Sequence, residues 1–140
     1  MLMRGVERAL PYLQQAIAQA CETRGISPQD VVLLGFSQGA AMALHMGLLS
    51  PVPYRGVLAY SGVCALPNTA PYLLPSTPVC LIHGEEDDVV PIATCTALAA
   101  TLNTWGVPLT VHRLPGVRHT IDAEGLNKGV DFLRRIGGDA

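Results

Sequence analysis

A serine between two glycines is the clearest sign of chemistry in this chain. It is the centre of residues 35–39, Gly-Phe-Ser-Gln-Gly, which follow four apolar residues and precede an alanine-rich run. In such a turn between a strand and a helix, the serine occupies a sharp, strained bend that exposes its hydroxyl group. We expect both Gly35 and Gly39 to be required there, because a Cβ at either position would collide with a neighbouring strand or helix. The pattern predicts that Ser37 is a nucleophile.

A serine hydroxyl is a weak nucleophile, so it needs a base that takes its proton and later returns that proton to the leaving group. His119 is the expected base, because it lies in a loop that follows a predicted strand. The other histidines fit this role less well. His45 lies within a predicted helix, His112 lies within a predicted strand, and His83 ends a strand where it is expected to support a turn.

A carboxylate on the far side of the imidazole would fix its tautomer and stabilise the imidazolium as it forms. The acidic residues Glu85, Glu86, Asp87 and Asp88 are the candidates, and spacing alone leaves all four open. Each of them could also belong to a solvated acidic loop. We expect no metal site there, because no second histidine lies at ligand spacing from His83.

Apolar runs that alternate with helical patterns must position these residues. Strands are predicted at residues 31–36, 56–61, 79–83 and 109–114, and helices at residues 6–24, 38–49, 91–105 and 126–136. Gly25 is expected to end the first helix, with Ile26 folding back in a Schellman cap. Strands that are apolar throughout indicate a parallel sheet, here of about four strands, flanked by helices in an α/β fold. Ligands bind at the carboxyl ends of such strands, where Ser37, the acidic turn and His119 all lie.

Composition limits the partners and the location of the chain. Its 140 residues predict a single domain over residues 1–140. A net charge of −2 without a basic run gives no support to a nucleic-acid partner. The four cysteines are far apart in apolar contexts and are expected to be reduced. No secretory signal pattern or run of about 20 apolar residues is present, so we expect a cytoplasmic protein without integral membrane association.

Three stretches together resemble the phospholipase/carboxylesterase family of α/β-hydrolases, which includes the acyl-protein thioesterases. They are residues 35–39, residues 83–91 (His-Gly-Glu-Glu-Asp-Asp-Val-Val-Pro) and residues 115–119 (Pro-Gly-Val-Arg-His). The order Ser, Asp, His along the chain is also that of α/β-hydrolases. The resemblance spans nearly the whole chain and selects Asp87 as the acid. It implies hydrolysis of carboxylic esters or thioesters through an acyl-serine intermediate, without a metal or organic cofactor.

The chain departs from the family pattern in three ways. Asp88 stands where a proline is usual, and Arg118 replaces the second glycine of a Gly-x-Gly stretch. Members of the family also begin with several strands and a His-Gly loop that supplies half of the oxyanion hole, whereas this chain starts within the helix before the nucleophile strand. We therefore expect it to lack the N-terminal part, leaving the N–H of Gln38 as one oxyanion donor. Losing one such donor costs about 10²–10³ in kcat.

The resulting hypothesis is a serine esterase or thioesterase in which Ser37, His119 and Asp87 form the triad and the substrate is a small ester or acyl thioester. Two alternatives are a catalytically silent remnant of a hydrolase and, less in keeping with the resemblance, an α/β-hydrolase peptidase. In the proline-rich loop, side chains that could line an acyl pocket are Leu66, Tyr72, Leu73 and Leu74. The outer edge of the strand at residues 31–36 is expected to be unpaired, which favours a homodimer or aggregates.

Overall fold

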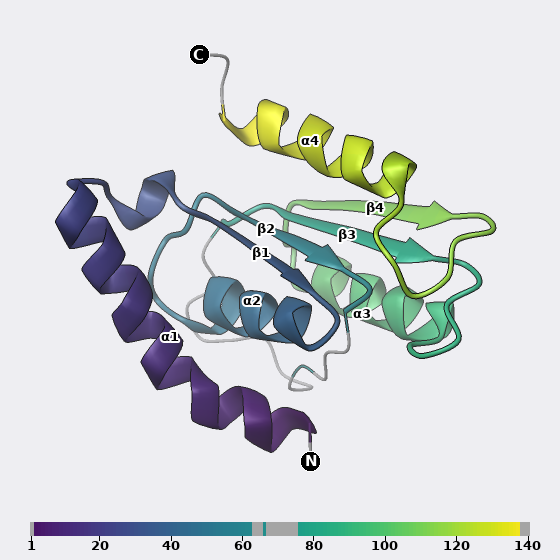
Figure 1. Ribbon diagram of the computed structural model, residues 1–140, viewed down its shortest axis with the longest axis horizontal. Helices are drawn as coiled ribbons and strands as arrows, with labels where there is room; N and C mark the ends of the chain where they lie inside the picture. Colours follow the sequence, from purple (N-terminus) through teal and green to yellow (C-terminus); the bar gives the residue numbers. More distant parts are fainter. Residues whose placement is uncertain (1, 63–65, 67–75, 138–140) are drawn as a thin grey trace.

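A computed structural model describes residues 2–62, 66 and 76–137 and confirms the α/β class (Figure 1). Four parallel strands form one sheet in the order β1-β2-β3-β4. The strands are β1 (Val32–Phe36), β2 (Gly56–Tyr60), β3 (Val79–Gly84) and β4 (Leu109–Leu114). The helices are α1 (Leu2–Arg24), α2 (Gln38–Leu49), α3 (Ile92–Thr104) and α4 (Ala123–Gly137), with a short 3₁₀ turn η1 (Pro28–Asp30).

The helices form a layer on each face of the sheet (Figure 1). Helices α2 and α3 lie on one face because the strands advance in one direction and right-handed crossovers then return on the same side. Helix α1 packs beside α2, and the larger core on this side includes Leu44, Val57 and Leu102. Helix α4 covers the opposite face, where Ile82 and Phe132 belong to a second core. Strands β2 and β3 are consequently buried along their whole length.

Strand β1 is less well covered, because it lies at the edge of the sheet and α4 packs on β2, β3 and β4. Its side chains that point toward the α4 face stay exposed, with 58% of Leu34 and 37% of Phe36 accessible. The N–H of Ser37 donates to the carbonyl of Tyr60 across 2.8 Å. Since every second residue of a parallel strand bonds to the same neighbour, the backbone groups of Val32, Leu34 and Phe36 face the open edge.

The ends of the elements agree with the sequence predictions to within a few residues. Gly25 has a φ of 65°, and the amides of Gly25 and Ile26 donate to the carbonyls of Glu22 and Cys21 at 3.3 and 3.0 Å. These two bonds are the predicted Schellman cap. Strand β2 ends one residue before the predicted Ser61, because Ser61 turns away with a φ of 52°.

Candidate active site

Ser37 lies in the sharp turn between β1 and α2. Its φ of 57° and ψ of −117° put a non-glycine residue in a sparsely populated region, which costs about 1–3 kcal/mol. A Cβ on Gly35 would collide with the backbone of Gly39 and Ala40, as the sequence predicted. The expectation for Gly39 was wrong, since a Cβ there would meet no described atom within 4 Å.

The reason is that Gly39 borders an open groove rather than a packed strand. The groove has a volume of about 450 Å³ and lies between α1, the edge strand β1 and α2. It is lined by Leu13, Ile17, Val31, Val32, Leu33, Leu34, Gly39, Met42, Ala43 and Met46. A methyl group on Gly39 would therefore enter free space.

The hydroxyl group of Ser37 is directed to a histidine and not to its own helix. Although Ser37 is the N-cap residue of α2, its side chain makes no capping hydrogen bond. Its Oγ lies 3.1 Å from Nε2 of His119. The hydroxyl proton can therefore be donated to that nitrogen.

The buried carboxylate of Asp87 lies on the other side of the same imidazole. Its Oδ2 is 2.8 Å from Nδ1 of His119, and the side chain of Asp87 is fully buried. Because an ionised carboxylate only accepts, Nδ1 carries the proton in this pair and Nε2 is left as an acceptor for Ser37. The structure thus brings Ser37, His119 and Asp87 into one hydrogen-bonded line.

The other oxygen of Asp87 is held by the backbone of its own loop. The amides of Val89 and Val90 donate to Oδ1 at 2.9 and 2.7 Å. Burial by itself raises the pKa of Asp87, but the hydrogen bonds from His119, Val90 and Val89 outweigh it and hold the pKa below its ordinary value. Asp87 is therefore ionised at neutral pH.

His83 supports this turn, as the sequence predicted. Its buried Nε2 lies 2.7 Å from the carbonyl oxygen of Val90, to which it must donate because a carbonyl only accepts. The same nitrogen is 3.4 Å from Oδ2 of Asp87. His83 thus holds the backbone of Val90, whose amide donates to Asp87, through a buried hydrogen bond.

Close backbone packing brings the loop of His119 to the loop of Asp87. The two loops follow the neighbouring strands β3 and β4, and the amides of Glu85 and Glu86 donate to the carbonyls of Leu114 and Val117, each at 2.9 Å. A Cβ on Gly84 would collide with the carbonyl of Val117. Glycine at the end of β3 is therefore needed for this approach.

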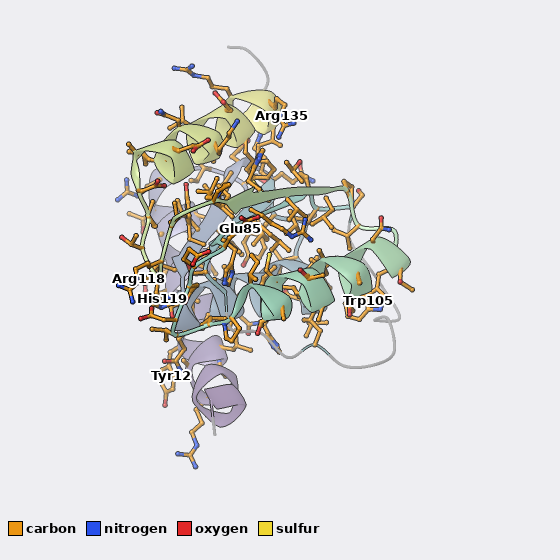
Figure 2. The ribbon with its side chains drawn as sticks, turned by 90° about the vertical axis from the view of Figure 1, so that its right-hand side faces the viewer. Tyr12, Glu85, Trp105, Arg118, His119 and Arg135 are labelled. Atoms are coloured by element: carbon orange, nitrogen blue, oxygen red, sulfur yellow. The ribbon has the colours of Figure 1, made fainter. Side chains whose placement is uncertain are left out.

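The four acidic candidates are separated by burial. Glu85, Glu86 and Asp88 are exposed, and only Asp87 among these four is buried. Asp88 instead accepts a hydrogen bond of 2.8 Å from the guanidinium group of Arg118. Figure 2 shows Arg118 beside His119, at the end of the molecule opposite Trp105.

The N–H of Gln38 is the first of helix α2. The amides of Ala40 and Ala41 both donate to the carbonyl of Ser37, whereas the first amides of a helix have no carbonyl within the helix to bond. The amide of Gln38 also lies at the positive end of the helix dipole. Its role as oxyanion donor stays a prediction.

Phe36 contacts the site, and the sequence reasoning missed it. Its ring lies 4.8 Å from the imidazole of His119, centroid to centroid, at an interplanar angle of 44°. Phe36 directly precedes the nucleophile, but residue spacing gives no information about which side chain meets the histidine ring. The contact depends on how the loop after β4 folds back over the end of β1.

Of the four predicted acyl-binding residues, the structure describes Leu66 alone. Leu66 packs against the larger core and borders a hollow of about 400 Å³ along α3, which is lined by no residue of the Ser37–His119–Asp87 line. Tyr72, Leu73 and Leu74 lie outside the described residues. A role of Leu66 in substrate binding stays a prediction.

Two kinds of feature are absent from residues 2–62, 66 and 76–137. No helix in this part is both long and apolar enough to cross a membrane. No group of three or more histidine, cysteine, aspartate or glutamate side chains in it is arranged to hold a metal ion. His45 lies within α2 and His112 within β4, both as predicted.

Comparisons with known proteins agree on one family. A family model described as Phospholipase/Carboxylesterase matches residues 3–136. Acyl-protein thioesterase 1 of Gibberella zeae is 34% identical over 137 residues, which are 94% of this chain and 58% of the relative. Esterase YpfH of Escherichia coli (strain K12) is 30% identical over 130 residues, which are 92% of this chain and 55% of the relative.

Solved structures give the same result for the fold. The crystal structure of esterase PE8 has a TM-score of 0.89 and 37% identity, and the match covers 96% of this chain and 63% of that one. The structure of SOBER1 from Arabidopsis thaliana has a TM-score of 0.79 and 26% identity, and the match covers 96% and 64% of the two chains. The chain therefore spans less than two thirds of the length of these relatives.

Proposed function

The chain belongs to the phospholipase/carboxylesterase family and has its α/β-hydrolase fold, and from this we propose that it is a serine hydrolase of carboxylic esters or thioesters. Relatives named as an acyl-protein thioesterase and as an esterase support this reaction class. In the proposal, Ser37 is the nucleophile, His119 is the base and then the acid, and Asp87 orients His119.

One observation carries the assignment of these roles. The imidazole of His119 has Oγ of Ser37 at 3.1 Å on one nitrogen and Oδ2 of Asp87 at 2.8 Å on the other. Each distance is within the reach expected of a nucleophile with its base and of a base with its orienting acid.

Acyl transfer follows from this arrangement. Oγ of Ser37 attacks the carbonyl carbon of the substrate while Nε2 of His119 takes the hydroxyl proton, and Asp87 stabilises the imidazolium. His119 then donates that proton to the leaving alcohol or thiol, which departs and leaves an acyl-serine. Water then attacks the acyl-serine while His119 takes a proton from it, and His119 returns that proton to Oγ of Ser37 as the carboxylic acid leaves, which restores both residues.

The negative charge that develops on the carbonyl oxygen of the substrate needs hydrogen-bond donors that stabilise it. The N–H of Gln38 is the proposed one, because it follows the nucleophile directly and lies at the N-terminus of α2. Such donors act on charge that appears only in the transition state, so they raise kcat more than they tighten substrate binding.

The proposed substrate is a small ester or an acyl thioester, with Leu66, Tyr72 and Leu73 as candidates for acyl contact. The reaction as written needs no cofactor and no nucleic-acid partner. A cytoplasmic location is part of the proposal, and the free, buried thiols of Cys21, Cys80 and Cys95 are compatible with it.

Covalent labelling and turnover test this function together. A fluorophosphonate should label the chain at Ser37, and p-nitrophenyl butyrate should be hydrolysed, with both signals absent from Ser37→Ala. Ser27→Ala is the matched control, because Ser27 precedes β1 at the opposite end of the strand. Labelling that persists in Ser37→Ala would refute the assignment of the nucleophile.

A silent remnant is the second candidate, since the chain spans only 58% and 55% of two esterase relatives. It predicts labelling at Ser37 without measurable hydrolysis. The peptidase alternative predicts cleavage of chromogenic peptides in preference to p-nitrophenyl esters, so the same series of assays separates all three.

A further inference from the structure

Two loops meet at the site: the acid loop, residues 85–91 after β3, and the His119 loop, residues 115–122 after β4. Two side-chain hydrogen bonds connect them, and these bonds come from consecutive residues on both loops. Asp87 bonds to His119 at 2.8 Å, and the next residue, Asp88, bonds to the preceding residue, Arg118, also at 2.8 Å. The first pair is the proposed catalytic one. The second has no part in the mechanism above.

Backbone bonds between the loops end before these residues. The amide of Glu86 donates to the carbonyl of Val117, and the following bond in the His119 loop, from the amide of Thr120 to the carbonyl of Arg118, is internal to that loop. Within the described part of the chain, the hydrogen bonds that residues 118–119 make to the acid loop are therefore made by side chains. Because Arg118 directly precedes His119, the hydrogen bond to Asp88 that holds the Arg118 side chain also restrains the backbone of His119.

The backbone accepts an arginine at this position without strain. The non-glycine residues with positive φ among the described ones are Ser37 and Ser61, so Arg118 does not need the left-handed conformation that favours glycine. In the family pattern given above, a proline stands at the position of Asp88 and a glycine at that of Arg118. Those two residue types act on a loop through the backbone conformation. Here the two positions where the chain departs from that pattern, Asp88 and Arg118, bond to each other.

We propose that the Asp88–Arg118 ion pair is a positioning device that holds the His119 loop against the acid loop and so keeps His119 aligned between Ser37 and Asp87. Neither residue touches the reacting atoms. The catalytic part of this inference rests on the proposed function, whereas the restraint on the loop does not.

The exposure of the two side chains sets the expected effect of removing the pair. The side chains of Arg118 and Asp88 are 71% and 57% exposed, and an ion pair in such surroundings changes an equilibrium by up to about fivefold. We therefore expect Asp88→Asn and Arg118→Gln each to lower kcat by about two- to fivefold with KM unchanged. The loss should shrink in 1 M salt, because screening weakens the pair in the unmodified chain as well.

A double-mutant cycle with rescue is the sharpest test. The double variant Asp88→Asn/Arg118→Gln should be no slower than either single one, because both changes remove the same interaction. Arg118→Lys and the charge swap Asp88→Arg/Arg118→Asp should recover part of the lost rate, since each keeps opposite charges in the pair. Glu86→Gln is the control, because it removes a charge from an exposed side chain of the same loop and should leave kcat unchanged.

A second measurement does not depend on activity. Amide hydrogen exchange in residues 117–120 should be faster in both single variants than in the unmodified chain and in Glu86→Gln, and slower again in the charge swap. If the chain hydrolyses no ester but exchange follows this order, the proposed function fails and the loop restraint stands. Additive losses in the double variant, or single variants that change neither kcat nor exchange, would overturn the inference.

Discussion

Oδ2 of Asp87 lies 2.8 Å from Nδ1 of His119, and the side chain of Asp87 is fully buried. In Asp87→Asn the side-chain amide can donate as well as accept, so it no longer selects the tautomer of His119 that accepts from Ser37. We expect kcat to fall by about 10⁴, measured with p-nitrophenyl butyrate.

The neighbouring carboxylate provides the comparison. Asp88→Asn should keep kcat within about fivefold of the unmodified chain, because Asp88 is exposed and contacts Arg118 rather than the imidazole. If instead Asp88→Asn were the inactive variant, the acid would have to be reassigned.

The buried carboxylate of Asp87 also predicts that the stability of the fold depends on pH. Burial raises the pKa of Asp87, but the hydrogen bonds from His119, Val90 and Val89 together outweigh it, so the pKa is lowered in the folded chain. An aspartate in the unfolded chain titrates near ~3.9, so the ionised group stabilises the fold above that pH and loses this contribution as the pH falls through the lower, folded value. Thermal melts should therefore show the gap between the unmodified chain and Asp87→Asn narrowing below about pH 4. A gap that stays constant from pH 6 to the acid limit would contradict the lowered pKa.

Gly35 and Gly39, the two glycines that flank the Ser37 turn, should respond differently to alanine. Gly35→Ala forces a methyl group into the backbone of Gly39 and Ala40, so the melting temperature and fluorophosphonate labelling of Ser37 should both fall. In Gly39→Ala the added methyl group meets no described neighbour within 4 Å, and the residue lies in the first turn of α2, where alanine is favoured by less than the ~1 kcal/mol of a helix interior. It should melt at the same or a higher temperature, and a large loss of stability would show that the groove beside Gly39 is filled in solution.

The open edge of β1 predicts that the 140-residue chain associates with a second copy. The outward backbone groups of Val32, Leu34 and Phe36 are free of β2, the strand carries no charge, and 58% of Leu34 is exposed. Light scattering should show dimers or larger species for the unmodified chain and a shift toward monomer for Leu34→Lys. Leu126→Lys is the matched control, because Leu126 is 57% exposed but lies on α4. A soluble monomer with a sharp melting transition would rule this association out.

Much of the sheet could be predicted from local patterns, and so could the places of Ser37 and His119 in the loops that follow β1 and β4. The four strands were predicted to within a residue or two. For β2 and β3 the apolar runs have a clear physical reason, because strands buried on both faces carry apolar side chains throughout. The end of α1 at Gly25 was predictable too, since a glycine directly after a helical pattern is typical of a helix C-terminus.

Features that depend on packing could not be predicted in this way. Spacing left four acidic residues open, and the family resemblance was needed to select Asp87. The burial of Asp87 and the amides of Val89 and Val90 that hold it are not visible in spacing. The space beside Gly39 is a property of three elements together. The contact of Phe36 with His119 joins residues that are far apart in the chain.

Helix α4 has a consequence for the synthesis of the chain. Among the described elements, it is the one that packs on the face of the sheet formed by Leu58, Tyr60, Cys80 and Ile82. Whatever follows it, α4 leaves the ribosome after all four strands. A nascent chain can thus assemble its sheet while that apolar face is still bare, and this interval is when a chaperone that shields exposed apolar surface would matter most.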